Sequence, residues 1–164
     1  MAEVVIFLGS KSDESKVAPC MQLLKELEIS YFVTICSAHR TVQLLEKVIE
    51  REEQAGCQVF ICAAGMGAHL AGACAARTTH PVIGIPIAGQ NLAGLDALLS
   101  TVQMPPAYPV ATVALDGAKN AAWLCAQILA LTREDLRAKI KEQRILMQQE
   151  IERQGTELSR KYQV

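Results

Sequence analysis

The feature that most constrains this chain is a short apolar segment, rich in β-branched residues, that recurs along the sequence. The first of these segments covers residues 3–8, and similar ones follow at 31–36, 58–62, 82–86 and 110–114. A run that is apolar almost without interruption is typical of a strand covered on both faces, as in a parallel sheet. Each run leads into a polar or glycine-rich turn and then into a helical pattern. The sequence therefore predicts five strand–turn–helix units.

The segments between the predicted strands carry apolar residues at helical spacing. We expect helices through Val17–Leu27 and through Leu44–Ile49, the second closed by Gly56, and further helices at 68–76, 95–103 and 118–131. Alternation of strands with helices predicts an α/β fold with a doubly wound parallel sheet of the flavodoxin-like type and right-handed crossovers.

Residues 133–161 differ in composition from the rest of the chain. Glu, Lys, Arg and Gln dominate there, with a thin apolar stripe that includes Leu136, Ile140 and Ile151. At ~1.5 Å per residue such a helix spans about 40 Å, which is longer than a small domain needs. We expect residues 1–132 to form the catalytic α/β domain and 133–164 a C-terminal helix of the same domain that packs on neighbouring subunits. The alternative is a solvated tail.

Composition excludes several classes of partner. The 164 residues are 51% apolar and 4% aromatic, and 16 basic residues nearly balance 17 acidic ones. The chain therefore has neither a basic patch for nucleic acid nor aromatic residues for base stacking, and we expect no nucleic-acid or membrane partner. The six cysteines contain no Cys-x-x-Cys pair, so we expect free buried thiols and no metal. With no apparent signal peptide or membrane span, the expected location is the cytoplasm.

Three of the predicted turns carry side chains suited to chemistry. Residues 9–13 (Gly-Ser-Lys-Ser-Asp) start a helix and can form an anion site, or they can simply cap it through Ser12 or Asp13. Residues 37–41 contain His39, which can carry a proton, and Arg40, which can hold a phosphate, although both could be ordinary surface residues.

The third turn, at 63–70, is rich in Ala and Gly and contains His69. Small residues there let the backbone approach a ligand closely. Because the turns after neighbouring parallel strands meet in one crevice, the three turns predict a site for a small phosphorylated metabolite. His39 would be available in that site for proton transfer.

Four of these motifs together resemble a known family. They are residues 9–13, Ser37-Ala38-His39-Arg40-Thr41, the Ala-Gly-x-x-Ala-His-Leu pattern at 64–70, and Val102–Pro105. In this order and spacing they are similar to the phosphoribosylaminoimidazole carboxylase/mutase (PurE-like) family of purine biosynthesis. The resemblance implies a three-layer α/β fold and a homo-octamer with active sites at subunit interfaces.

The resemblance also implies roles for individual residues. His39 would be the catalytic proton carrier at ring carbon C4 of the substrate, a ribonucleotide. Ser10, Ser12 and Arg40 would hold its phosphate, Asp13 its ribose and Ser37 the region of the reacting ring. A small dry pocket for CO2 would be formed by residues of the third turn: Ala64, Gly65, Gly67, His69 and Leu70. No cofactor is required.

Two histidines and two charged residues keep open roles. His69 could orient the carboxylate or cap the short helix, whereas His80, which precedes Pro81 at a strand start, is expected to be structural. Asp116 and Lys119 could be a helix cap and a solvated charge, or could support the site.

The family contains two reactions, and the sequence favours one of them. Mutase-type sequences usually read Gly-Gly-Ala-Ala-His-Leu-Pro-Gly, whereas this chain has Met66 and Ala71 in the corresponding segment, 65–72. Residues 116–120 also look like those of the direct carboxylases. We therefore expect an ATP-independent carboxy-lyase that converts 5-aminoimidazole ribonucleotide (AIR) and CO2 to 4-carboxyaminoimidazole ribonucleotide (CAIR). The alternatives are N5-carboxyaminoimidazole ribonucleotide mutase and a non-catalytic sugar-phosphate binding protein.

Overall fold

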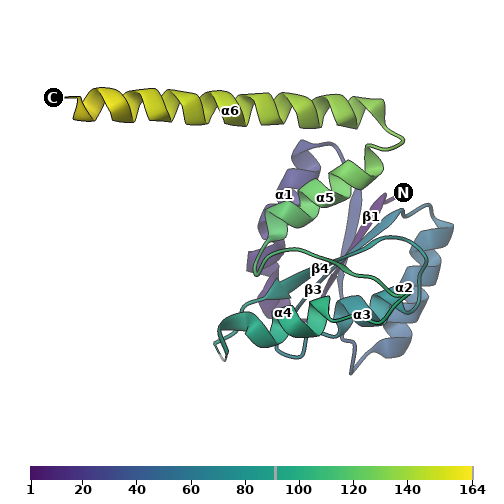
Figure 1. Cartoon of the computed structure of the whole chain (residues 1–164). Helices are drawn as coiled ribbons and strands as arrows, with labels where there is room; N and C mark the ends of the chain where they lie inside the picture. Colours follow the sequence, from purple (N-terminus) through teal and green to yellow (C-terminus); the bar gives the residue numbers. More distant parts are fainter. Residues whose placement is uncertain (91, 164) are drawn as a thin grey trace. The chain divides into compact units, whose positions relative to one another are not determined.

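The apolar segments pair into a single parallel sheet, as Figure 1 shows for the computed structural model, which describes residues 1–90 and 92–163. Within this part of the chain the five strands lie in the order β2-β1-β3-β4-β5. Their bounds are Val4–Leu8 for β1, Tyr31–Ile35 for β2, Val59–Gly65 for β3, Val82–Ile87 for β4 and Ala111–Thr112 for β5. This is the flavodoxin-like order, and the predicted fold class is confirmed.

Helices follow the strands as predicted. The 3-10 turn η1 (Lys11–Asp13) and α1 (Glu14–Glu26) come after β1, and α2 (Val42–Gln54) comes after β2. β3 is followed by α3 (Leu70–Ala75), and β4 by the 3-10 turn η2 (Leu92–Gly94) and α4 (Leu95–Val102). After β5 come α5 (Ala118–Leu129) and α6 (Glu134–Tyr162). Gly56 has a φ of 97° just after α2, which is the left-handed position where a glycine ends a helix.

The core lies on both faces of the central strands. All residues of β1 and β4 are buried, because helices cover the two faces of the sheet. On one face, Phe7 and Phe60 stack in a cluster with side chains of α2 and α3 such as Leu45 and Leu70. The edge strand β2 differs, since Val33 and Ile35 are exposed.

Two strands differ in length from the prediction. β3 continues beyond Cys62 to Gly65, because Ala63, Ala64 and Gly65 pair with β4 and stay extended despite their small side chains. The turn that follows it therefore starts only at Met66. β5 has two residues, Ala111 and Thr112, where the sequence predicts five at 110–114, and the amide of Gly117 donates to the carbonyl of Ala114 in a turn just beyond it.

The chain divides into two compact units, Met1–Cys125 and Ala126–Val164. The second contains α6, a helix of 29 residues that matches the long helix predicted over 133–161. Leu136 and Ile140 near its start are buried, whereas Met147, Ile151 and Leu158 are exposed. Among the helices described, none is long and apolar enough to span a bilayer.

All six cysteines are free and buried. Burial disfavours the charged thiolate, and it raises the pKa of the Cys20 thiol to about 12 and that of Cys57 to about 11. Cys20 and Cys57 are therefore packing residues whose thiols stay protonated at neutral pH.

Gly84 in β4 provides a test of how tightly the sheet packs against α4. A Cβ at this position would lie 2.5 Å from Cγ2 of Thr101 and 2.9 Å from Cγ1 of Val110. Both neighbours are β-branched and stiff, so Gly84→Ala should lower the free energy of unfolding by about 1–3 kcal/mol. Urea unfolding followed by circular dichroism measures this change.

The matched control is Gly89→Ala, because a Cβ at Gly89 would meet nothing within 4 Å. We expect the control to unfold at the wild-type urea concentration. Equal midpoints for Gly84→Ala and the wild type would show that β4 and α4 are packed more loosely than the structure indicates.

Candidate functional site

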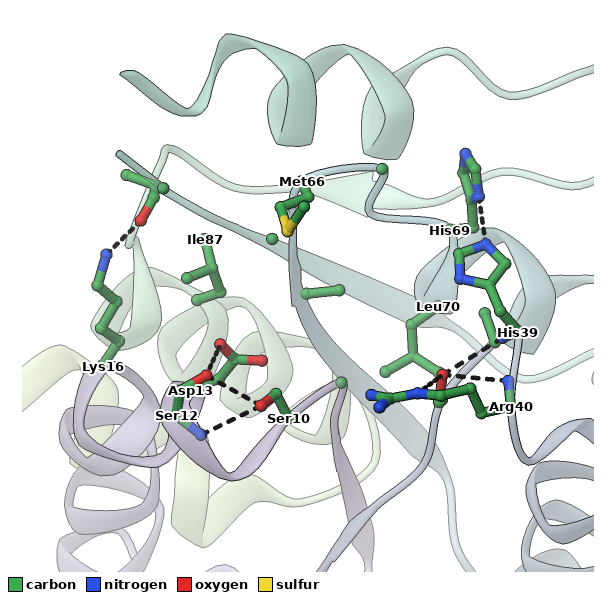
Figure 2. Close-up of a pocket in the computed structure, with 18 residues that line it drawn as sticks. Ser10, Ser12, Asp13, Lys16, His39, Arg40, Met66, His69, Leu70 and Ile87 are labelled. Atoms are coloured by element: carbon green, nitrogen blue, oxygen red, sulfur yellow. Dashed lines mark hydrogen bonds between the residues drawn. The ribbon is translucent and has the colours of Figure 1, made fainter. Parts of the chain in front are cut away.

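A cavity of about 630 Å³ opens at the carboxyl ends of β1, β2, β3 and β4 (Figure 2). The turns after these strands supply its walls, as expected for an open parallel sheet. All eleven residues that the sequence analysis selected line this cavity. They are Ser10, Ser12, Asp13, Ser37, His39, Arg40, Ala64, Gly65, Gly67, His69 and Leu70. Their position in one cavity is a structural finding, whereas their roles remain predictions.

The turn after β1 is held by serine hydroxyls. The Oγ atom of Ser10 accepts from the backbone N of Ser12 at 3.3 Å and from the Ser12 hydroxyl at 2.9 Å. Ser10 thereby caps η1, whereas Asp13, at the start of α1, makes no side-chain capping bond. The interpretation of Ser12 or Asp13 as the cap is therefore wrong. Their side chains lie at the cavity.

Asp13 is a buried carboxyl at the edge of the cavity, with 8% of its surface exposed. Burial raises its pKa above the ordinary value of 3.8, although hydrogen bonds from Ser10 and Ser12 and the charge of Lys16 act in the opposite direction. Keeping the charged Asp13 carboxylate out of water costs free energy in the free protein, and a hydrogen-bond donor on a bound ligand would offset that cost.

The turn after β2 is organised by Ser37. Its Oγ atom accepts from the backbone N of Arg40 at 3.2 Å and of His39 at 3.4 Å, and its backbone N donates to Oγ1 of Thr41 at 2.8 Å. Nε of Arg40 also donates to Ser37 Oγ, at 3.4 Å. This local network holds an exposed imidazole and an exposed guanidinium at the cavity rim.

His39 and His69 form a pair. Nε2 of His39 and Nδ1 of His69 lie 2.7 Å apart in a hydrogen bond, and the rings meet edge to face with centroids 5.0 Å apart. One ring must donate and the other accept, so the bond selects complementary tautomers. His69 precedes α3 but makes no side-chain capping bond, so the capping role left open for it is wrong.

The structure adds Lys16 to the site, which the sequence analysis did not select. Its Nζ atom donates to the carbonyl of Ala88 at 2.7 Å and to Oδ2 of Asp116 at 2.9 Å. Oδ1 of Asp116 in turn accepts from the backbone N of Ala88 at 2.9 Å. Lys16 lies one helical turn after Asp13, a spacing that could have indicated it. The Ala88 contact joins residues 72 positions apart, which no local pattern reveals.

The three remaining candidates, His80, Asp116 and Lys119, lie in different surroundings. His80 lies outside the cavity, where Nδ1 bonds to Glu53 Oε1 at 3.0 Å and the ring packs on Phe60. This agrees with the structural role expected for it. Asp116 supports the cavity wall through Lys16 and Ala88, whereas Lys119 is exposed on α5 and does not line the cavity. Within residues 1–90 and 92–163, no three His, Cys, Asp or Glu side chains are grouped to hold a metal.

Comparison with known proteins identifies the family. The family model described as AIR carboxylase matches residues 3–150. The chain belongs to this family. Its members are enzymes of purine biosynthesis, and a small-molecule ribonucleotide substrate is consistent with the polar turns that line the cavity.

Similar members of the family have a named reaction. A protein of Pyrococcus abyssi is 45% identical over 144 residues, 88% of this chain and 83% of that protein. One of Bacillus subtilis is 44% identical over 143 residues, 86% of this chain and 88% of that protein. Both are named N5-carboxyaminoimidazole ribonucleotide mutase. A crystal structure of Treponema denticola PurE superposes with a TM-score of 0.88 at 28% identity, over 94% of this chain and 97% of that one.

These relatives overturn the expected reaction. The prediction of a direct, CO2-using AIR carboxylase is wrong, because the curated relatives at 41–45% identity are named mutases. Most of the positions on which the expectation relied lie outside the cavity. Ala71 is buried in α3, and neither Ala71 nor residues 116–120 line the cavity. Met66 does line it, but its side chain is 68% exposed.

The raised pKa of Asp13 predicts a pH-dependent stability difference. A carboxyl whose pKa is raised by folding contributes its full stability below the unfolded-state pKa and loses it as pH rises through the folded-state pKa. At pH 7 the ionised Asp13 therefore lowers stability. We expect Asp13→Asn to have a higher free energy of unfolding than the wild type at pH 7, with the difference shrinking as pH falls toward 3.8.

Asp135→Asn is a control of opposite sign. A hydrogen bond from Arg133 lowers the pKa of the exposed Asp135 carboxyl, so its removal should not stabilise the protein at pH 7. Urea midpoints at a series of pH values measure both variants. A pH-independent difference between Asp13→Asn and the wild type would contradict the burial argument.

Proposed function

We propose that this protein is an N5-carboxyaminoimidazole ribonucleotide mutase, which moves a carboxyl group from the exocyclic nitrogen of the substrate to ring carbon C4. The sequence identity of 41–45% to proteins with this name, over most of the chain, carries the proposal. The cavity supports it, because it combines hydroxyl and guanidinium donors for a phosphate with an accessible imidazole pair.

The reaction needs one proton to be added and one to be removed. Breaking the N–C bond releases CO2 and leaves an amine nitrogen that takes up a proton. C4, made electron-rich by that amine, then attacks CO2 and forms a C–C bond. The ring must finally lose the C4 proton to regain aromaticity. One imidazole can supply the first proton and accept the second, so the overall reaction is an isomerisation.

We assign this proton transfer to His39. Its Nε2 atom is 2.7 Å from Nδ1 of His69, so in the free protein the pair already shares a proton. Bound substrate can replace His69 as the hydrogen-bond partner of His39, or it can exchange a proton with His39 while His39 stays bonded to His69. A positioned acid–base group of this kind contributes typically ~10²–10⁴-fold to the rate.

The remaining walls bind and enclose the substrate. In the proposal, the phosphate is held by side chains of the first two turns, and the ionised carboxylate of Asp13 accepts from the ribose hydroxyls. The small residues of the third turn enclose the freed CO2, which is apolar and suits an Ala/Gly-lined wall. The phosphate ligands are Ser10, Ser12 and Arg40; Ser37 lies near the ring, and Ala64, Gly65, Gly67, His69 and Leu70 form the CO2 pocket.

Assembly is part of the proposal. We assign residues 1–132 to catalysis and residues 133–164 to association in a homo-octamer. The proposed reaction requires no cofactor. The exposed Met147, Ile151 and Leu158 of α6 recur at helical spacing and support burial against another copy. The free thiols are consistent with the reducing cytoplasm.

The substrate test separates the reactions of the family. Purified protein should convert N5-carboxyaminoimidazole ribonucleotide to CAIR in buffer kept free of CO2, without ATP. With AIR and bicarbonate at matched concentrations it should show no comparable turnover. Ultraviolet absorbance of CAIR follows both reactions. Turnover of AIR with CO2, combined with none of the N-carboxylated compound, would refute the mutase assignment.

His39→Asn sharpens this test. We expect kcat to fall by ~10²–10⁴-fold while ligand binding, measured by calorimetry, is retained. His80→Asn is the matched control, since His80 lies outside the cavity. Equal losses in the two variants would show that the effect is not specific to the site.

Deletion of residues 145–164 tests the role of α6. The deletion removes exposed apolar side chains of α6, so the mass in solution should fall below that of the octamer. Sedimentation measures the mass, and Gln149→Ala is the control that keeps the assembly, because the exposed Gln149 lies two positions after Met147 and so on the opposite face of α6. An unchanged octamer after deletion would exclude α6 as its main contact.

A further inference from the structure

The turn between β3 and α3 is strained. Met66 has a φ of 57°, in the left-handed region that side chains other than Gly, Asn and Asp seldom adopt. Its side chain is 68% exposed, so packing of the side chain does not account for the conformation. Such strain costs of order 1–3 kcal/mol and persists only where surrounding contacts impose it.

The contact that imposes it comes from Ser100 in α4. Its Oγ atom accepts from the backbone N of Ala68 at 2.9 Å and lies 3.4 Å from the carbonyl of Met66. Its own proton has a close acceptor in the Asp96 carbonyl, at 2.6 Å. The hydroxyl thus bridges α4 and both ends of the strained segment.

A serine in a helix commonly donates to a carbonyl one turn earlier in the same helix, without a bond to another segment. Among the described residues, the hydroxyl of Thr101, the next residue, bonds only to the helix carbonyl of Ala97, at 2.7 Å. Ser100 makes the equivalent bond within α4 and in addition accepts the Ala68 amide, 32 residues away in the chain. The extra bond links α4 to the cavity wall.

The segment that Ser100 holds determines where His69 lies. Ala68 immediately precedes His69, and the backbone N of His69 donates to the carbonyl of Gly67 at 2.8 Å. The imidazole folds back over Gly67, since a Cβ there would be 3.4 Å from Cε1 of His69. From this position Nδ1 of His69 reaches His39.

We propose that Ser100 is a positioning residue of the active site: its hydroxyl holds the Met66–Ala68 turn and so sets the His69 ring against His39. Ser100 does not line the cavity and acts only through this turn. The kinetic part of the inference rests on the proposed mutase function, whereas the geometry of the histidine pair does not.

The spectroscopic test uses the small number of histidines. The chain has three, and His80 lies outside the cavity, so 15N-histidine labelling gives few and separable imidazole signals. In Ser100→Ala the ring nitrogens of His39 and His69 should shift while those of His80 stay in place. Ser100→Thr keeps a hydroxyl and should restore the wild-type spectrum.

The kinetic test uses the same variants. Ser100→Ala should lower kcat about 10-fold with little change in KM, because a misplaced catalytic pair affects the chemical step more than binding. Ser100→Thr should recover most of the loss. Thr101→Val, which removes a neighbouring hydroxyl of the same helix, should leave both kcat and the imidazole signals as in the wild type.

The outcomes decide between the two proposals. Wild-type imidazole signals in Ser100→Ala would overturn the positioning role, as would wild-type kcat. Shifted signals in a protein that shows no mutase activity would refute the proposed function and leave the positioning role supported. If Ser100→Ala does not fold, the test is repeated in a Met66→Gly background, where glycine removes the strain. The double variant with Ser100→Ala is then compared with the Met66→Gly single variant. Identical spectra there would again overturn the inference.

Discussion

The parallel register of β1 with its two neighbours is the interaction on which the site depends. Leu8, the last residue of β1, pairs with Ile35 of β2 and with Ala63 of β3. The turns that carry Ser10, Ser37 and residues 66–70 therefore leave the sheet at the carboxyl ends of these strands. The approach is close, since a Cβ at Gly9 would lie 3.3 Å from Cβ of Ala64. A slip of register by one residue would turn the side chains to the opposite faces and separate these groups.

Two residues of the cavity have features that cost stability in the free protein. Asp13 is buried with a raised pKa, and Met66 is left-handed with an exposed side chain. Both residues line the cavity, where strain and desolvated charge can be retained because a ligand uses them.

Much of the site could be predicted from local sequence. A turn that contains His39 and Arg40 after a β-branched run is recognisable because strand, turn and helix each have their own short-range pattern. The reaction type was predicted wrongly, because it was inferred from identity at Met66, Ala71 and 116–120, and most of those residues do not line the cavity. Ser100 and Lys16 were missed, since their partners lie 32 and 72 residues away.

The sequence by itself determined the alternating strands and helices, the three polar turns and the residues available for proton transfer and phosphate binding. These follow from hydrophobic periodicity and residue chemistry, which act over a few positions. Only the tertiary structure decided that Nε2 of His39 meets Nδ1 of His69 and that the Ser100 hydroxyl accepts from the backbone N of Ala68. These contacts join elements distant in sequence, and their geometry is set by how the sheet and helices pack.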